Sequence, residues 1–122
     1  MKIAIIVREE TMQKCTGRGC FRAFNQRVDA FERYKGMVDV ELISFMHNGG
    51  DLDHKINRLR EAEVDTIHLS TCMRASSDDY GQLAETLSKE FNIVGYTHGG
   101  KDGKIRKTIS IKCSKKCLKI DI

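Results

Sequence analysis

The sequence predicts an α/β protein with a three-layer α/β/α arrangement around a mainly parallel sheet. Short apolar runs alternate along the chain with amphipathic segments, which is the order expected of strands connected by helices. The first run, residues 2–7, is apolar on both faces, a pattern typical of a central strand in a parallel sheet. The two observations together favour a doubly wound sheet over an antiparallel one.

Hydrophobic spacing predicts the elements of the first half. Apolar side chains three and four positions apart predict a helix between residues 21 and 36. Its inward face is expected to hold Phe21, Phe24, Val28 and Phe31. Alternation predicts a second strand at residues 38–45, nearer the sheet edge. A second helix is expected from about Asp53.

The second half continues the same alternation. Residues 65–70 predict a third strand that runs on into residues 71–74, and polar residues at 76–78 predict the N-cap of a third helix. Residues 92–96 predict a fourth strand. Beyond a turn, the strict alternation of residues 104–112 predicts an added C-terminal edge strand. This order of elements is flavodoxin-like or Rossmann-like.

Length and composition limit the class of protein. A chain of 122 residues with 40% apolar residues predicts a single domain over residues 1–122. No apolar run is long enough to cross a membrane, and the first run is too short for a secretory signal. We therefore expect a cytoplasmic protein with no membrane partner. In a reducing compartment, five cysteines favour metal ligation or thiol chemistry over a disulfide framework.

The positive charge of the chain is confined to its C-terminal segment. Residues 101–122 hold eight Lys and Arg against two Asp, a net charge of +6, so the overall +4 leaves −2 for residues 1–100. A basic tail can bind nucleic acid through phosphates. This segment has no aromatic residue for base stacking, so a solvated, charged edge is the favoured interpretation. No specific partner is predicted.

Cysteine and histidine residues follow three of the predicted parallel strands. Cys15 and Cys20 follow the first strand, Cys72 follows the third, and His98 follows the fourth. Loops at the carboxyl ends of parallel strands share one edge of the sheet, so we expect these four side chains to converge. Three thiols and one imidazole form a donor set that zinc accepts. The sequence therefore predicts a zinc site at this edge.

Other residues of these loops have simpler interpretations. Gly17 and Gly19 permit a tight turn between the two thiols, and they are expected to line the cleft together with Gly49 and Gly50. His68 lies within a buried strand, which favours a hydrogen-bonded core residue over a metal ligand.

Several motifs resemble those of one known family. They are Cys15-x-Gly17-x-Gly19-Cys20-Phe21, Ala23-Phe24-Asn25, Phe31-Glu32-Arg33-Tyr34, His68-Leu69-Ser70-Thr71-Cys72-Met73 and Gly95-Tyr96-Thr97-His98. Over about residues 1–100 the chain is similar to the CGGC-domain proteins, small and mostly prokaryotic α/β proteins of unassigned activity. The resemblance implies metal binding through cysteines and a histidine.

The chain departs from the family pattern at the motif that gives the family its name. Cys-Gly-Gly-Cys corresponds here to Asn48-Gly49-Gly50-Asp51, so both cysteines are replaced. His47 and Asp51 are weaker candidates for substitute ligands, since they offer harder donor atoms. The tail pair Cys113 and Cys117 lies beyond the resemblance and is interpreted as a second half-site, a redox pair or two incidental thiols.

Three function classes remain open from the sequence. A low-molecular-weight phosphatase would need Cys-x5-Arg, but Phe21 stands at the arginine position and Arg22 comes one residue late. A metal-binding protein is the leading interpretation. A thiol-redox protein that uses Cys15 with Cys20 or Cys72 is the alternative. The third class is a non-catalytic binding module with a remnant site.

Overall fold

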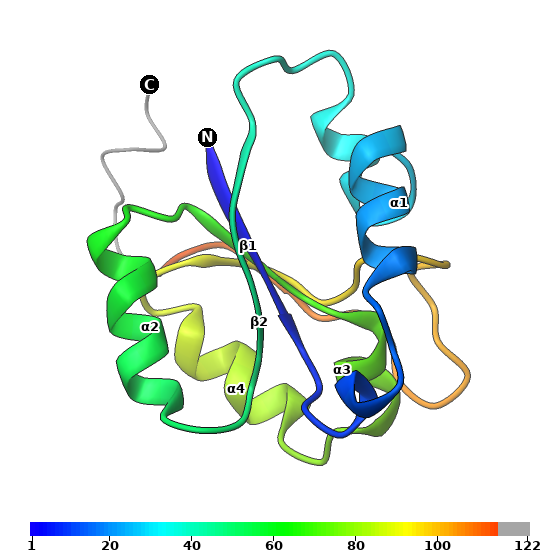
Figure 1. Ribbon diagram of the computed structural model, residues 1–122, viewed down its shortest axis with the longest axis vertical. Helices are drawn as coiled ribbons and strands as arrows, with labels where there is room; N and C mark the ends of the chain where they lie inside the picture. The colour runs from blue at the N-terminus through cyan, green and yellow to red at the C-terminus, as the bar shows by residue number, and fades with distance from the viewer. Residues whose placement is uncertain (115–122) are drawn as a thin grey trace.

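The computed structural model of the protein describes residues 1–114, which form a five-stranded sheet with helices packed against it (Figure 1). The strand order is β2-β1-β3-β4-β5. The bounds are β1 (Lys2–Val7), β2 (Glu41–His47), β3 (Thr66–Leu69), β4 (Asn92–Val94) and β5 (Ser110–Ile111). The strands β1 to β4 pair in parallel, and β5 pairs antiparallel with β4. The predicted α/β class, with its parallel sheet and added edge strand, is confirmed.

Helices connect the parallel strands. They are α1 (Arg18–Gln26), α2 (Leu52–Glu61), α3 (Thr71–Ser76) and α4 (Tyr80–Leu87), with 3-10 segments η1 (Thr11–Gln13) and η2 (Asp29–Tyr34). In Figure 1, α2 and α4 lie on one side of the sheet and α1 on the other. None of the helices found in residues 1–114 combines the length and the apolar character that a membrane span requires.

The side chains of β1 alternate between two hydrophobic clusters. Ala4 and Ile6 belong to the cluster that includes residues of α2 and α4. Ile3, Ile5 and Val7 belong to the cluster that includes residues of α1 and η2. All five are at most 2% exposed, so β1 is buried on both faces, as its continuous apolar sequence predicts. The loop with Cys15 thus leaves a central strand.

The helix predicted between residues 21 and 36 is interrupted. Arg27 ends α1 in the left-handed region with φ of 55°, and the Val28 N–H donates to the Ala23 carbonyl, which closes the helix end. The chain restarts as η2 after an extended Val28. Phe31 is fully buried, as predicted. Phe21 was expected to face the core, but it is 36% exposed.

The segment after β3 forms a short helix that the sequence pattern did not reveal. Residues 71–74 were expected to extend the strand, but Ser70 caps α3 by accepting a hydrogen bond from the Met73 N–H at 3.4 Å. The next helix, α4, begins at Tyr80. Cys72 therefore lies in the first turn of a helix at the carboxyl edge of β3.

The two edge strands also differ from the prediction. Strand β2 begins at Glu41 instead of residue 38, and Val38 is 99% exposed. Only Ser110 and Ile111 of the predicted strand 104–112 pair with β4, while Asp102 and Lys107 form a separate bridge. Ile105, which lies on the apolar side of the alternation in residues 104–112, is 73% exposed. Cys117 and the rest of the tail beyond residue 114 lie outside the described residues.

Candidate functional site at the carboxyl edge of the sheet

The carboxyl ends of β1, β3 and β4 carry the residues that the sequence predicted as ligands. Because these strands pair in parallel, the segments that leave their carboxyl ends lie at one edge of the sheet. A loop with Cys15 and the start of α1 follow β1, Cys72 follows β3, and Thr97 and His98 follow β4. We call Cys15, Cys20 and Cys72 the thiol centre.

Cys15 is the exposed member of the thiol centre. Gly17 precedes α1 with φ of 82°, a left-handed conformation that glycine adopts without strain. This turn directs the Gly17 N–H to the Cys15 Sγ, at 3.3 Å. The thiol of Cys15 is otherwise open to solvent.

Cys20 is the buried member, with 5% of its surface exposed. Its Sγ lies 3.2 Å from the Oγ1 of Thr97. Burial raises the pKa of the Cys20 thiol, the hydrogen bond with Thr97 lowers it, and the charges of Cys72 and Cys15 raise it further. Both other thiols are therefore close enough to act electrostatically on Cys20.

Cys72 packs on the same side of the sheet as Cys20. It is partly buried against the cluster that holds Cys20 and the odd-numbered residues of β1. Its Sγ lies 2.7 Å from the Ser70 Oγ and accepts a hydrogen bond from the Arg8 N–H at 3.4 Å. These two contacts fix the position of the Cys72 sulfur at the carboxyl edge of β3.

Thr71 and His98 complete this edge. The Thr71 Oγ1 donates to the His98 carbonyl at 2.6 Å and accepts from the N–H groups of Thr97 and His98 at 3.3 and 3.2 Å. A Cβ placed on Gly19 would lie 3.1 Å from the His98 ring, so glycine permits the close approach of α1. Burial lowers the pKa of His98, although Asp29 opposes the shift.

The sequence did not single out the hydroxyl groups that hold this edge together. Ser70, Thr71 and Thr97 supply the hydroxyl contacts of the two less exposed thiols and of the His98 backbone. Their position in the sequence was a usable signal, because Ser70-Thr71 directly precedes Cys72 and Thr97 directly precedes His98.

The thiols and His98 share an edge without forming a ready-made metal site. Among residues 1–114, no three side chains of His, Cys, Asp or Glu are arranged so that they could hold a metal ion. The donor chemistry fits a soft metal, but the described conformation does not coordinate one.

The weaker candidate ligands have local structural partners instead. Asp51 caps α2 by accepting from the His54 N–H at 3.0 Å. The His47 Nδ1 accepts from the Gly49 N–H at 3.0 Å and lies 3.6 Å from a Glu9 carboxylate oxygen. The Asn48 Oδ1 accepts from the Glu9 N–H at 2.9 Å. The loop between β2 and α2 is thus held in part by Asn48 and Asp51, the two residues that the resemblance aligns with the family's cysteines.

The glycines of that loop have distinct roles. The carboxylate of Glu9 occupies the space that a Cβ on Gly49 would need, and Gly50 has φ of 68°. Both positions therefore require glycine for reasons of packing or conformation.

His68 is a core residue, as predicted. It is fully buried, its Nε2 lies 2.7 Å from the Tyr34 hydroxyl, and its Nδ1 lies 3.2 Å from the Tyr96 carbonyl. Burial lowers the pKa of His68 to about 3 and raises that of Tyr34 to about 12. The ring also stacks on Phe31 at a centroid distance of 4.4 Å.

Comparison with known proteins agrees with the resemblance seen in the motifs. The family model described as "CGGC domain" matches residues 2–98. The uncharacterized protein MJ0582 of Methanocaldococcus jannaschii is 30% identical over 107 aligned residues, with 76% of this chain and 81% of that protein covered. No solved structure shows significant similarity. The chain belongs to the CGGC domain family.

Proposed function

We propose that this protein binds a metal ion that prefers thiolate ligands, zinc in the first instance, through Cys15, Cys20 and Cys72 with His98. The observation that carries the proposal is the packing of Cys20 and Cys72 in one cluster at the carboxyl edge of the sheet, with Cys15 in the loop that leads into α1. Cys72 is distant from the other two in the sequence, and the parallel sheet brings it to them. Membership of the CGGC domain family supports the same class of function.

Binding in this proposal requires a rearrangement at Cys15. Within residues 1–114 the exposed Cys15 thiol has a single hydrogen-bond contact, from the Gly17 N–H. Cys20 and Cys72 are fixed by contacts with Thr97, Ser70 and the Arg8 N–H. Movement of the Cys15 side chain is therefore the least costly way to gather the donors. A zinc ion would supply the charge that stabilises neighbouring thiolates.

A thiol-redox function is the second candidate, and the contrast between Cys15 and Cys20 favours it. An exposed thiol beside a buried one suits exchange with a disulfide substrate. The Cys15 thiolate would attack one sulfur of that disulfide and release the other as a thiolate. Cys20 or Cys72 would then attack the mixed disulfide, so that the substrate leaves reduced and the protein is oxidised by two electrons.

One preparation separates the two candidates. We propose a reducing compartment such as the cytoplasm, so the protein should be purified without a metal-affinity tag under anaerobic conditions. About one zinc per chain by elemental analysis, with all thiols recovered after chelation, supports metal binding. No metal, together with the loss of two thiols on incubation with oxidised glutathione, supports redox exchange. No metal and unreactive thiols would contradict both.

A further inference from the structure

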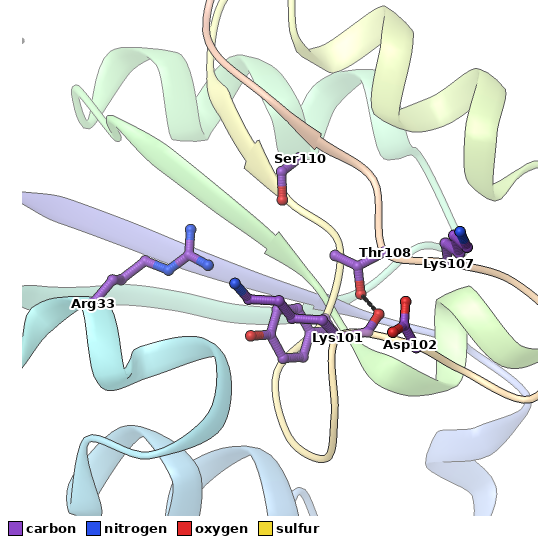
Figure 2. Close-up of a pocket in the computed structure, with 7 residues that line it drawn as sticks. Arg33, Lys101, Asp102, Lys107, Thr108 and Ser110 are labelled. Atoms are coloured by element: carbon purple, nitrogen blue, oxygen red, sulfur yellow. Dashed lines mark hydrogen bonds between the residues drawn. The ribbon is translucent and has the colours of Figure 1, made fainter.

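A cavity next to the segment that follows β4 has the chemistry of an anion site. Its volume is about 260 Å³, and it lies between η2 and the segment that follows β4 (Figure 2). Tyr96 lines it, one residue before the Thr97 that contacts Cys20. The cavity therefore adjoins the functional edge of the sheet without containing any of its cysteines.

Three cations line this cavity against one carboxylate. Arg33 extends from η2 toward Lys101, and Lys107 and Asp102 lie on the far side (Figure 2). The lining thus carries a net charge of +2. None of the three cations forms an ion pair with a carboxylate of residues 1–114. The Nε of Arg33 donates to the Ala30 carbonyl, which orients the guanidinium and leaves its other N–H groups for a ligand.

The wall that carries Lys101 is fixed by a buried arginine. Arg74, 5% exposed, donates from Nη1 to the Gly100 and Lys101 carbonyls at 3.0 and 2.8 Å and to the Thr108 Oγ1 at 2.6 Å. The Thr108 hydroxyl also donates to the Lys101 carbonyl. A wall formed before the ligand arrives lowers the entropic cost of binding.

Tyr96 adds a hydroxyl for which residues 1–114 supply no hydrogen-bond partner. The residue is 3% exposed, and its phenol oxygen makes no hydrogen bond within residues 1–114. Every buried side-chain nitrogen or oxygen in that range has a hydrogen-bond partner. Because the phenol oxygen of Tyr96 has none there, this atom must be accessible to solvent. Because Tyr96 lines the cavity, we expect its hydroxyl to be available for a hydrogen bond to a ligand there.

We propose that this cavity binds a small organic dianion, such as a phosphate monoester or a dicarboxylate. Two negative charges balance the net charge of the lining. The volume lies just below the ~300 Å³ at which small-molecule sites usually begin, which suits a compact metabolite. Arginine and lysine recognise both anion types, the arginine through paired N–H groups. The proposal goes beyond metal binding and does not depend on it.

Calorimetric titration of the full chain tests this proposal. Glycerol 3-phosphate and succinate serve as probes at low ionic strength. The protein is first freed of metal with a chelator that is then removed by dialysis, because a polycarboxylate chelator would itself compete for the cavity. Arg33→Gln, Lys101→Gln and Tyr96→Phe remove the proposed contacts. Lys104→Gln is the matched control, because it removes a lysine of the same segment that does not line the cavity.

The expected result is saturable binding of at least one probe, and the tighter probe identifies the ligand class. The affinity for the probe should fall about tenfold in Arg33→Gln and in Lys101→Gln, and a few fold in Tyr96→Phe. In the control Lys104→Gln it should fall less than about twofold. Added salt should weaken binding. Absence of saturable binding for both probes at about 10 mM would overturn the proposal. So would equal affinity in the wild type and Lys101→Gln, whose exposed position leaves folding intact.

Discussion

Cys20 and Thr97 lie 77 residues apart in the sequence, and in the folded chain the Sγ of one is 3.2 Å from the Oγ1 of the other. The contact joins the first turn of α1 to the carboxyl end of β4, and it is buried. It links the packing of the sheet edge to the ionisation of a thiol. Substitution of Thr97 should therefore alter both.

Thr97→Val should raise the pKa of Cys20, because the hydrogen bond that opposes the effect of burial is lost. It should also lower the free energy of unfolding by about 1 kcal/mol. The pH dependence of Cys20 alkylation, followed by mass spectrometry, measures the first effect, and urea unfolding measures the second. A Cys20 alkylation profile that moves to lower pH would contradict a contact between the two side chains.

The thiols should differ in their rate of alkylation by iodoacetamide. Cys15 is exposed, Cys72 is partly buried and Cys20 is buried, so the expected order is Cys15, then Cys72, then Cys20. Peptide mapping after timed quenching gives the three rates. Unfolding the protein in urea should remove most of the difference, which serves as the control. Early modification of Cys20 in the folded chain would show that the packing of α1 against the sheet does not bury this thiol.

The burial of His68 should make stability depend on pH. Its pKa is about 3 in the folded chain and about 6.5 when unfolded, so between these values only the unfolded chain binds the proton. The free energy of unfolding should therefore fall as the pH drops below about 6.5, by up to about 1.4 kcal/mol per pH unit from this residue. Above pH 6.5 the histidine contributes no slope.

Urea unfolding of the wild type and His68→Phe between pH 7 and 4.5 measures this contribution. Other titrating groups are shared, so the difference between the two slopes isolates His68. The variant should have the shallower slope, although its loss of the Tyr34 contact lowers its stability at every pH. A His68 ring proton resonance that titrates near pH 6.5 would disprove the assignment.

Two glycines with the same φ provide a matched pair. Gly17 and Gly36 both have φ of 82°, but a Cβ on Gly36 meets nothing within 4 Å, whereas one on Gly17 would lie 2.9 Å from the Phe45 ring. Gly36→Ala should cost about 1 kcal/mol in unfolding free energy from backbone strain alone. Gly17→Ala should cost more, and equal losses in urea unfolding would show that Phe45 yields to the new methyl group.

The sequence was sufficient for the sheet and for the edge at which the thiols gather. The apolar run of β1 and the regular alternation of elements determine a parallel sheet, and its topology places Cys72 beside Cys20 without any local signal. The break at Arg27 was not predictable, since a left-handed arginine has no sequence pattern of its own.

The segment of residues 104–112 shows why alternation of apolar and polar residues alone predicted too long a strand. The pattern of residues 104–112 is that of a strand, but Arg106 donates to the Arg74 and Ser77 carbonyls at 2.9 and 2.7 Å. These contacts with the end of α3 hold the segment away from β4 until Ser110. Side-chain orientation at the thiol centre was equally beyond the sequence, because the contacts with Ser70 and Thr97 determine it.

Zinc competition titration with a chromogenic chelator tests the central claim most directly. The proposal predicts tight zinc binding that weakens as the pH falls, since the thiols must release protons. Cys15→Ser and Cys72→Ser should each abolish it. Two control variants should leave the zinc affinity nearly unchanged. Cys113→Ser removes a thiol next to Asn92, at the opposite end of β4 from the proposed site. Asp51→Ala removes the N-cap of α2. Loss of binding in Asp51→Ala with full binding in Cys72→Ser would contradict the proposed site.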